Sequence, residues 1–551
     1  MIRQPLDKRL RFALHALGLA IALATTAHAA NAPVTVRIDA NAGRHAISPN
    51  IYGVAYAPDA ATLADLRAPL DREGGNTTST YDWQTNASNH ANDWYFESIR
   101  EDSGAVAGGM GDDFVTTAKG GNAQAMLTIP MLDWVAKVGS GGAKLASFSQ
   151  AKYGAQTDAD WQWFADAGNG VLASNGQYVA GNDPNDAYVG NSVALQQAWL
   201  DHLLARWGNA NHGGVKYYIL DNEHSIWHDT HRDVHPTGAT MDEVAQKMLA
   251  YGHMVRSRDP GAIILGPEEY GWTGYLLSGY DQQYGAAHGW DHHPDKDAHG
   301  GMDYMPWLLQ RLHQDELATG KRVLKVFTLH YYPQGPEFSD DVSTSTQQLR
   351  NRSTRSLWDP NYVDQSWVGD KVNLINRMKS WVASYYPGTR IGITEYNWGA
   401  ENHINGATTQ ADIYGIFGWK GVNYATRWTT PDASTPTYKA MKMYRNYDGH
   451  GAGFGDTSVR TISHNRDNLS AWGALRGSDG ALTVMVIAKV LSGTTTVTID
   501  LANFTPAAKA QWWQLTSANA INRLGDANVA AGKLVVTVPA QSINLFVIPK
   551  G

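Results

Sequence analysis

Short β-rich runs alternate with helical patterns between residues 51 and 430, and this alternation restricts the chain to few folds. Strands that alternate with helices form a parallel sheet in which the helices are the crossover connections. Several runs are almost continuously apolar, which is typical of strands buried on both faces. Eight such strand–helix repeats predict a closed (β/α)8 barrel, a TIM-like α/β fold. The runs are Ile51–Tyr56, Leu70–Asn76, Ala123–Met131, Val215–Glu223, Ala262–Glu269, Val326–Tyr332, Arg390–Asn397 and Val422–Thr429.

Two of the intervening helices can be predicted in detail, including where they begin or end. Leucine and tryptophan recur every fourth residue over 192–207, which predicts an amphipathic helix that Gly208 can end. Thr240 and Glu243 have the spacing of a capping box, and the helix that they open is expected to stop before residues 259–261.

The pattern changes near residue 455, after which strand-like runs follow one another without a helical period. These runs predict an all-β sandwich domain. A clean alternation over Val34–Ile38 lies before the barrel and is expected to join that sandwich. The expected domains are a signal peptide (1–30), an N-terminal strand segment (31–46), a catalytic barrel (47–450) and the sandwich (451–551). The C-terminal runs are Leu482–Val490, Thr494–Leu501, Gln511–Thr516 and Lys533–Ile548.

The first thirty residues have the composition of a secretory signal peptide. Basic residues precede an apolar run over 12–24, and Ala27-His28-Ala29 predicts cleavage near Ala29. No later stretch approaches the roughly 18 apolar residues of a membrane span. We therefore expect a secreted protein, extracellular or periplasmic, with no membrane partner.

Charge and cysteine content narrow the class further. The net charge is −8 and basic residues do not cluster, which argues against a nucleic-acid partner. The chain has no cysteine, so the exported protein is held by buried apolar surface rather than disulfides. We expect a monomer. The 20 Trp and 26 Tyr against 11 Phe suit stacking on sugar rings, although such rings also fill large cores.

Two apolar strands end in glutamate. Residues 215–220 run into Asp221, Asn222 and Glu223, and residues 391–394 run into Glu395. These are the fourth and seventh strands by count, and chemistry in such barrels lies where strands end at the C-terminal face. Two facing carboxylates suit glycoside hydrolysis, in which one acid protonates the departing oxygen and a second carboxylate attacks the anomeric carbon. The acid needs a raised pKa. The alternative is that each is a rim carboxylate in an ion pair.

Over residues 47–450 the sequence resembles glycoside hydrolase family 44. The resemblance is carried by Gly74–Thr78 with Tyr81–Asn89, by Leu220–Glu223 with Ile226-Trp227 and Thr230–Arg232, and by Thr394–Gly399.

The resemblance implies a retaining endo-β-1,4-glucanase, often active on xyloglucan, with Glu223 as acid/base and Glu395 as nucleophile. It also implies a barrel with a sandwich assembled from both chain ends. Two positions depart from the family pattern: His224 stands where Pro often follows the acid/base, and Glu73 stands where Trp is expected. The second departure is expected to place an extra carboxylate near the cleft.

Other side chains are candidates for substrate binding. Asn222 can bond the 2-hydroxyl of the sugar being cleaved, and His330 and Tyr332 are placed to orient Glu395. Trp398 and Trp428 are candidates for the cleft floor. Trp83, Trp94, Trp134 and Trp358 are candidates for stacking on flanking sugars. For His330, Tyr332 and these last four tryptophans, the alternative is a structural place in the core.

Histidine, aspartate and further glutamate residues suggest rival chemistries. Histidine and aspartate crowd residues 228–235 and 291–299, but neither segment has the spacing of a catalytic zinc site. A structural calcium is compatible with loop carboxylates, and catalysis needs no cofactor. Glu268 and Glu269, after the fifth strand, are expected to shape the cleft or pair with arginine. The alternative substrates are xylan and mannan, and the non-enzymatic alternative is a carbohydrate-binding protein.

Overall fold

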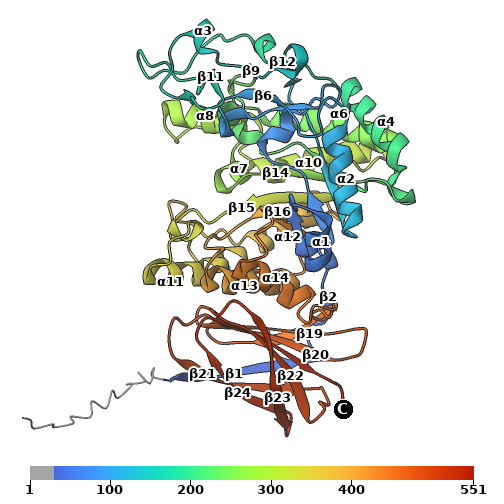
Figure 1. The fold of residues 1–551 in the computed structure, drawn as a ribbon, viewed down its shortest axis with the longest axis vertical. Helices are drawn as coiled ribbons and strands as arrows, with labels where there is room; N and C mark the ends of the chain where they lie inside the picture. The colour runs from blue at the N-terminus through green and yellow to red at the C-terminus, as the bar shows by residue number, and fades with distance from the viewer. Residues whose placement is uncertain (1–29) are drawn as a thin grey trace, which may run out of the picture.

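A computed structural model describes residues 30–551. The predicted signal peptide therefore lies outside the described residues, apart from residue 30. The chain forms an eight-stranded barrel with its helices and, beneath it in Figure 1, an all-β domain. The predicted fold class is confirmed.

Eight parallel strands close the barrel in the order β13-β14-β15-β16-β17-β3-β4-β7. Each strand lies within one of the eight predicted runs. Most of their residues are buried, as the apolar runs indicate. The barrel strands are β3 (Gly53–Ala55), β4 (Leu70–Arg72), β7 (Gln124–Ile129), β13 (Tyr217–Leu220), β14 (Ile263–Glu269), β15 (Val326–Tyr331), β16 (Arg390–Tyr396) and β17 (Tyr424–Arg427).

Helices surround the barrel, and their ends follow the expected capping. The Ser192 side chain accepts from the Leu195 amide at the start of α4, and Gly208 ends that helix at φ 82°. Thr240 accepts from the Glu243 amide at the start of α6 (3.1 Å). The main helices are α1 (Ala60–Leu66), α2 (Gly109–Gly120), α4 (Val193–Trp207), α6 (Met241–Arg258), α10 (Tyr304–Thr319), α12 (Leu374–Tyr385), α13 (Ile404–Lys420) and α14 (Pro436–Arg445).

Long insertions follow several barrel strands and form the top of the molecule in Figure 1. They contain small sheets that pair β5 with β6 and β9, β10 with β11, and β8 with β12. The strands are β5 (Ala87–Asn89), β6 (Glu97–Arg100), β8 (Trp134–Ala136), β9 (Leu145–Ala146), β10 (Ala159–Asp160), β11 (Phe164–Gly168) and β12 (Tyr188–Gly190). The helices of these insertions are α3 (Gln150–Tyr153), α5 (Trp227–Thr230), α7 (Trp272–Leu276), α8 (Gly279–His288) and α9 (Pro294–Ala298). Helix α11 (Thr344–Ser353) follows β15 and lies lower in Figure 1, beside α13.

The all-β domain joins both ends of the described chain. Strand β1 runs parallel to β21 and antiparallel to β18, so the N-terminal strand takes its expected place. The predicted run Lys533–Ile548 is two strands, because Gln541 turns the chain at φ 46°. Strands β18, β19 and β23 were not predicted. The strands are β1 (Asn31–Asp39), β2 (His45–Ala46), β18 (Thr457–Ile462), β19 (Leu469–Leu475), β20 (Leu482–Ala488), β21 (Thr494–Ala502), β22 (Lys509–Leu515), β23 (Ile521–Ala530), β24 (Lys533–Pro539) and β25 (Ser542–Ile548).

Barrel and all-β domain share one hydrophobic core across α13. The Trp472 ring lies against the α13 backbone at Gly415, where a Cβ atom would come within 2.1 Å of the ring. Beside it, the buried ammonium of Lys489 lies 2.8 Å from Asp412. This packing makes the two domains one structural unit.

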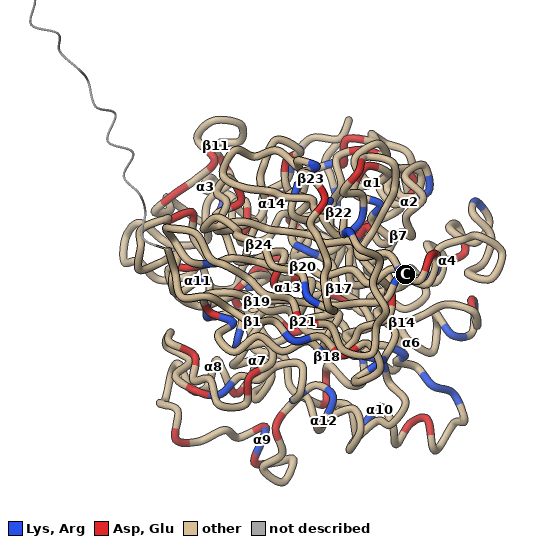
Figure 2. The backbone as a smooth tube through the Cα atoms, turned by 90° about the horizontal axis from the view of Figure 1, so that it is seen from below, with Lys and Arg blue, Asp and Glu red and all other residues tan. Residues whose placement is uncertain are grey.

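Charges are dispersed over the molecule. Acidic and basic residues are interspersed along the tube in Figure 2, in keeping with the dispersed charge of the sequence. Each helix described within residues 30–551 is too short or too polar to span a bilayer.

Candidate functional site

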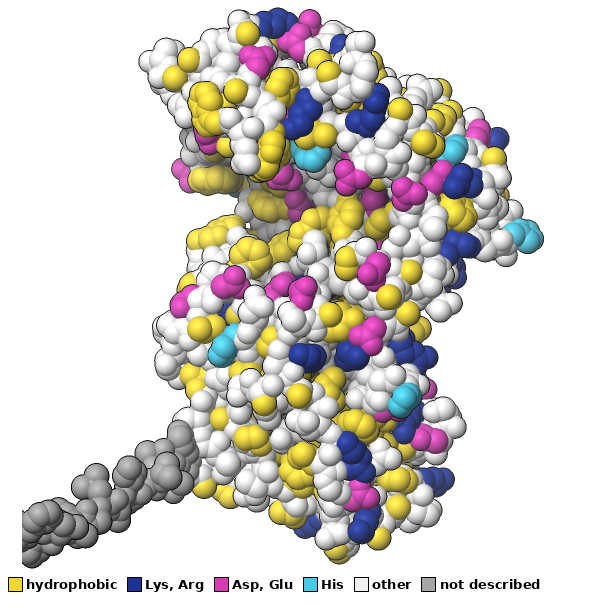
Figure 3. Space-filling view, in the orientation of Figure 1, with side chains coloured by type: hydrophobic (Ala, Val, Ile, Leu, Met, Phe, Trp, Pro, Cys, Tyr) yellow, Lys and Arg dark blue, Asp and Glu magenta, His cyan; other side chains and the backbone are white. Residues whose placement is uncertain are grey.

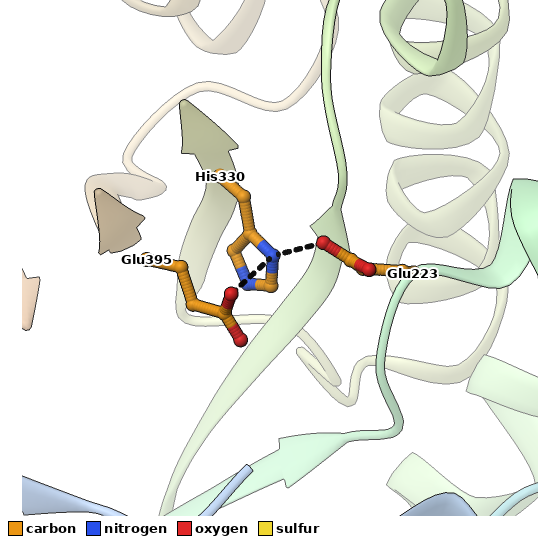
Figure 4. A group of neighbouring side chains, drawn as sticks. All are labelled: Glu223, His330 and Glu395. Atoms are coloured by element: carbon orange, nitrogen blue, oxygen red, sulfur yellow. Dashed lines mark hydrogen bonds and ion pairs between the residues drawn. The ribbon is translucent and has the colours of Figure 1, made fainter. Parts of the chain in front are cut away.

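Glu223 and Glu395 meet at the C-terminal ends of β13 and β16. One oxygen of each carboxylate and one ring nitrogen of His330 all lie within 4.8 Å of one another (Figure 4). Asp221 and Glu223 have positive φ values of 60° and 46°, so the chain turns sharply where β13 ends. Left-handed backbone at a non-glycine residue costs about 1–3 kcal/mol and clusters at functional sites.

His330, in β15, stands between the two carboxylates. Its Nδ1 lies 2.8 Å from Glu223 Oε1 and 3.6 Å from Glu395 Oε2, and its Nε2 lies 3.1 Å from Glu268 Oε2. Burial alone would lower the pKa of His330, but these three carboxylates raise it to about 10. The ring is therefore protonated at neutral pH and donates from both nitrogens.

Arg72, at the end of β4, is the second buried cation of the site. Its Nη1 donates to Glu395 Oε1 (2.7 Å), and its Nη2 lies 3.0 Å from Glu268 Oε2 and 3.1 Å from the Asn222 side-chain oxygen. Burial would raise the pKa of Glu268, but the charges of Arg72 and His330 lower it to about 2. Glu268 is therefore an ionised structural carboxylate, in keeping with the expected pairing with arginine.

The charge balance of the site explains the protonation state of Glu223. Five ionisable groups contribute to this balance. Arg72 and His330 supply two positive charges, and Glu268 and Glu395 supply two negative charges. The set is neutral only when Glu223 is protonated. Burial and the nearby Glu395 charge raise the pKa of Glu223, against the opposing effect of His330. Glu223 is thus a carboxyl group held toward its acid form beside an ionised partner.

The remaining polar groups fix the two strand ends. Asp221 accepts from the amides of Leu132 (3.2 Å) and Met131, and from the Ser79 hydroxyl, which ties the β13 turn to the neighbouring loops. Tyr332 donates its hydroxyl to Glu395 Oε2 (2.7 Å). Glu395 therefore receives a donor on each oxygen.

Trp428 lies at the same rim. Its ring is half-buried, with the Arg72 guanidinium 5.7 Å from the ring centroid and Tyr56 packed edge-on at 5.7 Å. A Cβ atom at Gly75 would come within 2.7 Å of the ring. The candidates Asn222, His330, Tyr332 and Trp428 are therefore all gathered around the two glutamates.

The other candidate tryptophans lie in different surroundings. Trp94 is partly exposed and its ring packs 5.7 Å from Trp163. Trp83 is half-buried and donates to the Leu195 carbonyl, and half-buried Trp134 lies in β8. Trp398 is buried with its indole N–H on Ser353, so it does not form an open cleft floor.

Trp358 does not lie where the predicted stacking on flanking sugars would place it. It packs edge-on against Trp419, and the Arg466 guanidinium covers it at 5.4 Å, between the barrel and the all-β domain. Its ring therefore serves the domain interface.

The two departures from the family pattern are both buried. Glu73 accepts from the Thr128 amide (2.8 Å), and burial raises its pKa to about 8. The side chain is held in the protein interior rather than projecting into an open cleft. His224 lies against Trp227, and burial lowers its pKa to about 3, so it is a neutral core histidine.

The described residues bring together one group with the spacing of metal ligands, namely Glu223, His330 and Glu395. Both ring nitrogens of His330 already face carboxylates, Nδ1 that of Glu223 and Nε2 that of Glu268. In the histidine-rich loops, Asp233 accepts from Ser147 and Tyr188, His235 pairs with Glu243, and Asp295 accepts from the Met241 amide.

One face of the molecule is hollowed. Figure 3 shows this face hollowed at the level of β15 and α7, between the part that carries α8 and the part that carries α11. Hydrophobic and acidic side chains lie in the hollow.

Comparisons with known proteins agree with this geometry. The sequence pattern of glycoside hydrolase family 44 matches residues 87–335. CelM2, a bifunctional glucanase-xylanase from a metagenome library, has a crystal structure that is 61% identical with a TM-score of 0.93, covering 95% of this chain and 100% of that chain. A xyloglucanase of the family from Paenibacillus polymyxa, solved with xyloglucan, is 27% identical with a TM-score of 0.79, covering 95% and 100%.

Endoglucanase A of Paenibacillus lautus is 28% identical over 553 residues, which span 96% of this chain and 74% of that protein. The resemblance found in the motifs is thus confirmed by the full-length comparisons. The chain is a glycoside hydrolase and belongs to glycoside hydrolase family 44.

Proposed function

We propose that this enzyme cleaves internal β-1,4 bonds of glucans, xyloglucan among them, by double displacement. Glu395 attacks the anomeric carbon while Glu223 protonates the departing oxygen; Glu223 then activates water to hydrolyse the glycosyl-enzyme. The observation that carries the proposal is the approach of the two carboxylates within 4.8 Å. Separations of about 5–5.5 Å suit direct attack, whereas inversion needs room for a water.

Donors on both oxygens of Glu395 support its part as nucleophile. Arg72 and Tyr332 hold the carboxylate in one orientation, and a fixed nucleophile reacts faster than a mobile one. His330 and Arg72 act as positioning residues. Asn222 accepts a hydrogen bond from Arg72, and in this proposal it bonds the 2-hydroxyl of the sugar being cleaved.

Xylan is the second candidate substrate. The relative that is 61% identical is described as a bifunctional glucanase-xylanase. Glucan and xylan share the linkage and differ by one hydroxymethyl group, which a pocket discriminates by only about 1–3 kcal/mol. Mannan has an inverted 2-hydroxyl and stays as a third substrate to assay.

The test combines a substrate panel with stereochemistry. Reducing ends are measured on xyloglucan, mixed-linkage glucan, carboxymethylcellulose, xylan and mannan, and NMR follows the anomer of the first product. We expect glucans to be hydrolysed with the β-anomer formed first. An initial α-anomer would exclude double displacement, and retention on the polymer without new reducing ends would favour a binding protein.

We further propose secretion after cleavage near Ala29, action as a monomer and catalysis without a cofactor. A structural calcium in the loops stays a prediction. Mass spectrometry of the protein exported by its host gives the mature N-terminus, and an N-terminus at Met1 would contradict the proposed cleavage.

A further inference from the structure

Glu269, at the end of β14, is a buried carboxyl group that takes no part in the double displacement. Its side chain is fully buried, and within residues 30–551 it forms no ion pair. The Arg72 guanidinium lies on the neighbouring Glu268 instead (3.0 Å). The expected pairing with arginine therefore applies to Glu268 alone. Burying a carboxyl group without a cation is costly, so the contacts of Glu269 indicate what it does.

The Glu269 carboxyl group is bonded to the turn that carries the acid. Its Oε1 accepts from the Ser225 hydroxyl (2.5 Å) and from the Tyr270 amide (3.0 Å). Ser225 is fully buried and comes shortly after Glu223 in the chain. The Glu223 amide also donates to the Glu268 carbonyl (3.1 Å). The end of β14 therefore holds this turn both through the backbone of Glu223 and through the side chain of Ser225.

The turn has little regular structure of its own. Strand β13 ends before it, and residues 224–226 form a single turn of 3-10 helix. Asp221 and Glu223 both have positive φ, which surrounding contacts must stabilise. A side chain on such a segment keeps its position only while those contacts hold. The bond between Ser225 and Glu269 is one of these contacts.

Helix α7 covers this hydrogen bond. A Cβ atom at Gly274 would come within 2.5 Å of Glu269 Oε1 and within 2.7 Å of Ser225 Oγ. The backbone of α7 therefore packs directly on the two bonded side chains, and no larger residue fits at position 274. A hydrogen bond that is shielded from water in this way is stronger than an exposed one.

Glu269 holds its proton at neutral pH. Burial raises its pKa to about 8, against the opposing effect of its hydrogen bonds to Ser225 and the Tyr270 amide. Its Oε2 is buried without a hydrogen-bond partner, which costs less for a neutral group than for a charged one. A neutral amide oxygen can therefore replace its Oε1 as an acceptor. The other ionisable groups that face it are Glu223, Tyr270, His330 in β15, Tyr275 in α7 and Tyr304 in α10.

We propose that Glu269 is a positioning residue: through Ser225 it holds the turn that carries Glu223, so that the acid meets the departing oxygen. The inference rests on the proposed function, because it takes Glu223 as the acid. A misplaced acid donates its proton poorly. The loss is greatest for a poor leaving group, such as a sugar hydroxyl or a simple phenol, and smallest for a dinitrophenolate, which departs without a proton.

The test compares phenyl and 2,4-dinitrophenyl β-cellotriosides by the ratio of their kcat/KM values at neutral pH. For Glu269→Ala we expect the phenyl-to-dinitrophenyl ratio to fall about tenfold, because general acid catalysis contributes about 10²–10⁴-fold and is lost only in part. Ser225→Ala should lower the ratio in the same way. The double variant should fall no further than either single variant, since all three remove one hydrogen bond. Glu269→Gln, which keeps the acceptor oxygen, should retain the wild-type ratio.

The matched control is Asp412→Ala, which removes a buried carboxylate at the domain interface and should leave the ratio unchanged. A thermal melt shows whether each variant is folded, and Ser225→Ala carries the same test if Glu269→Ala does not fold. A ratio lowered equally in Glu269→Gln and Glu269→Ala would overturn the proposal, because loss of charge would then be the cause.

Glu223→Gln separates this proposal from the proposed function. A lowered ratio in Glu223→Gln with a wild-type ratio in folded Glu269→Ala and Ser225→Ala would overturn the positioning role and leave the proposed function standing. A wild-type ratio in Glu223→Gln would overturn both, because Glu223 would then not be the acid.

Discussion

Two buried clusters of charge in this protein have opposite designs. At the barrel–sandwich interface, Lys489 and Asp412 form one ion pair whose further atoms are satisfied: Lys489 also donates to the Asn351 carbonyl (3.0 Å) and Asp412 also accepts from Trp472 (3.2 Å). At the active site, three carboxylates share two cations, and buried Arg72 Nε and Glu268 Oε1 have no partner.

The backbone conformation also differs between the two clusters. Asp221, Glu223 and Glu268 all have positive φ, whereas Asp412, Trp472 and Lys489 do not. At the domain interface, the paired charges of Lys489 and Asp412 stand on unstrained backbone and hold the domains together. At the active site, three carboxylates share two cations on strained backbone. One of these carboxyl groups, Glu223, can therefore gain and lose a proton, which acid–base catalysis requires.

The difference between the two clusters is tested most strongly by replacing the two active-site glutamates with neutral glutamine. Glu395→Gln and Glu223→Gln should each lower kcat by roughly 10³-fold or more, because attack and proton transfer need the carboxyl groups. Steady-state kinetics with a thermal melt on each variant checks this. Glu316→Gln, at a surface pair with Arg322, is the matched control. Near-normal turnover in either variant would reject its assigned role.

Arg72→Lys should lower kcat/KM by roughly 10²-fold, because one ammonium cannot reproduce the planar fork that reaches Glu395, Glu268 and Asn222. The control is Arg476→Lys, because Arg476 forms an ion pair with Asp479 away from the site. The kinetics of the two variants are compared. Equal activity in the two variants would show that Arg72 supplies charge alone.

The interface gives the converse expectation. Asp412→Ala leaves the buried Lys489 charge without its carboxylate, which should cost about 3–5 kcal/mol of unfolding free energy. Activity per folded molecule should hardly change. Denaturant unfolding checks the first part, with Asp479→Ala, from a surface pair, expected to cost about 0–1 kcal/mol. Loss of specific activity without loss of stability would contradict the division of roles.

The smallest expected effect is a shift in pH dependence. Glu223 must be protonated to donate, so kcat/KM falls as pH rises through its pKa. His330 is charged below its own pKa of about 10 and lowers the pKa of Glu223. His330→Asn should therefore move the alkaline limb to higher pH.

The control for this pH profile is His450→Asn, at an exposed position. An alkaline limb that moved to lower pH in His330→Asn would contradict the assignment of Glu223 as the acid.

The barrel was predictable because its strands are apolar runs whose local pattern survives in the fold. Glu223 and Glu395 could be placed because each directly ends such a run. Arg72 was not predicted as a site residue, because its partner Glu395 lies 323 residues away and no local pattern in the sequence indicates that pairing. Trp358 and Trp428 look alike in sequence, and only packing separates an interface ring from a ring at the site.

The most direct test is to trap the intermediate. The enzyme is incubated with an activated 2-deoxy-2-fluoro-β-cellotrioside, which slows hydrolysis of the glycosyl-enzyme, and the labelled peptide is identified by mass spectrometry. We expect one sugar per protein, attached to Glu395. A label on Glu223 or Glu268 instead would contradict it.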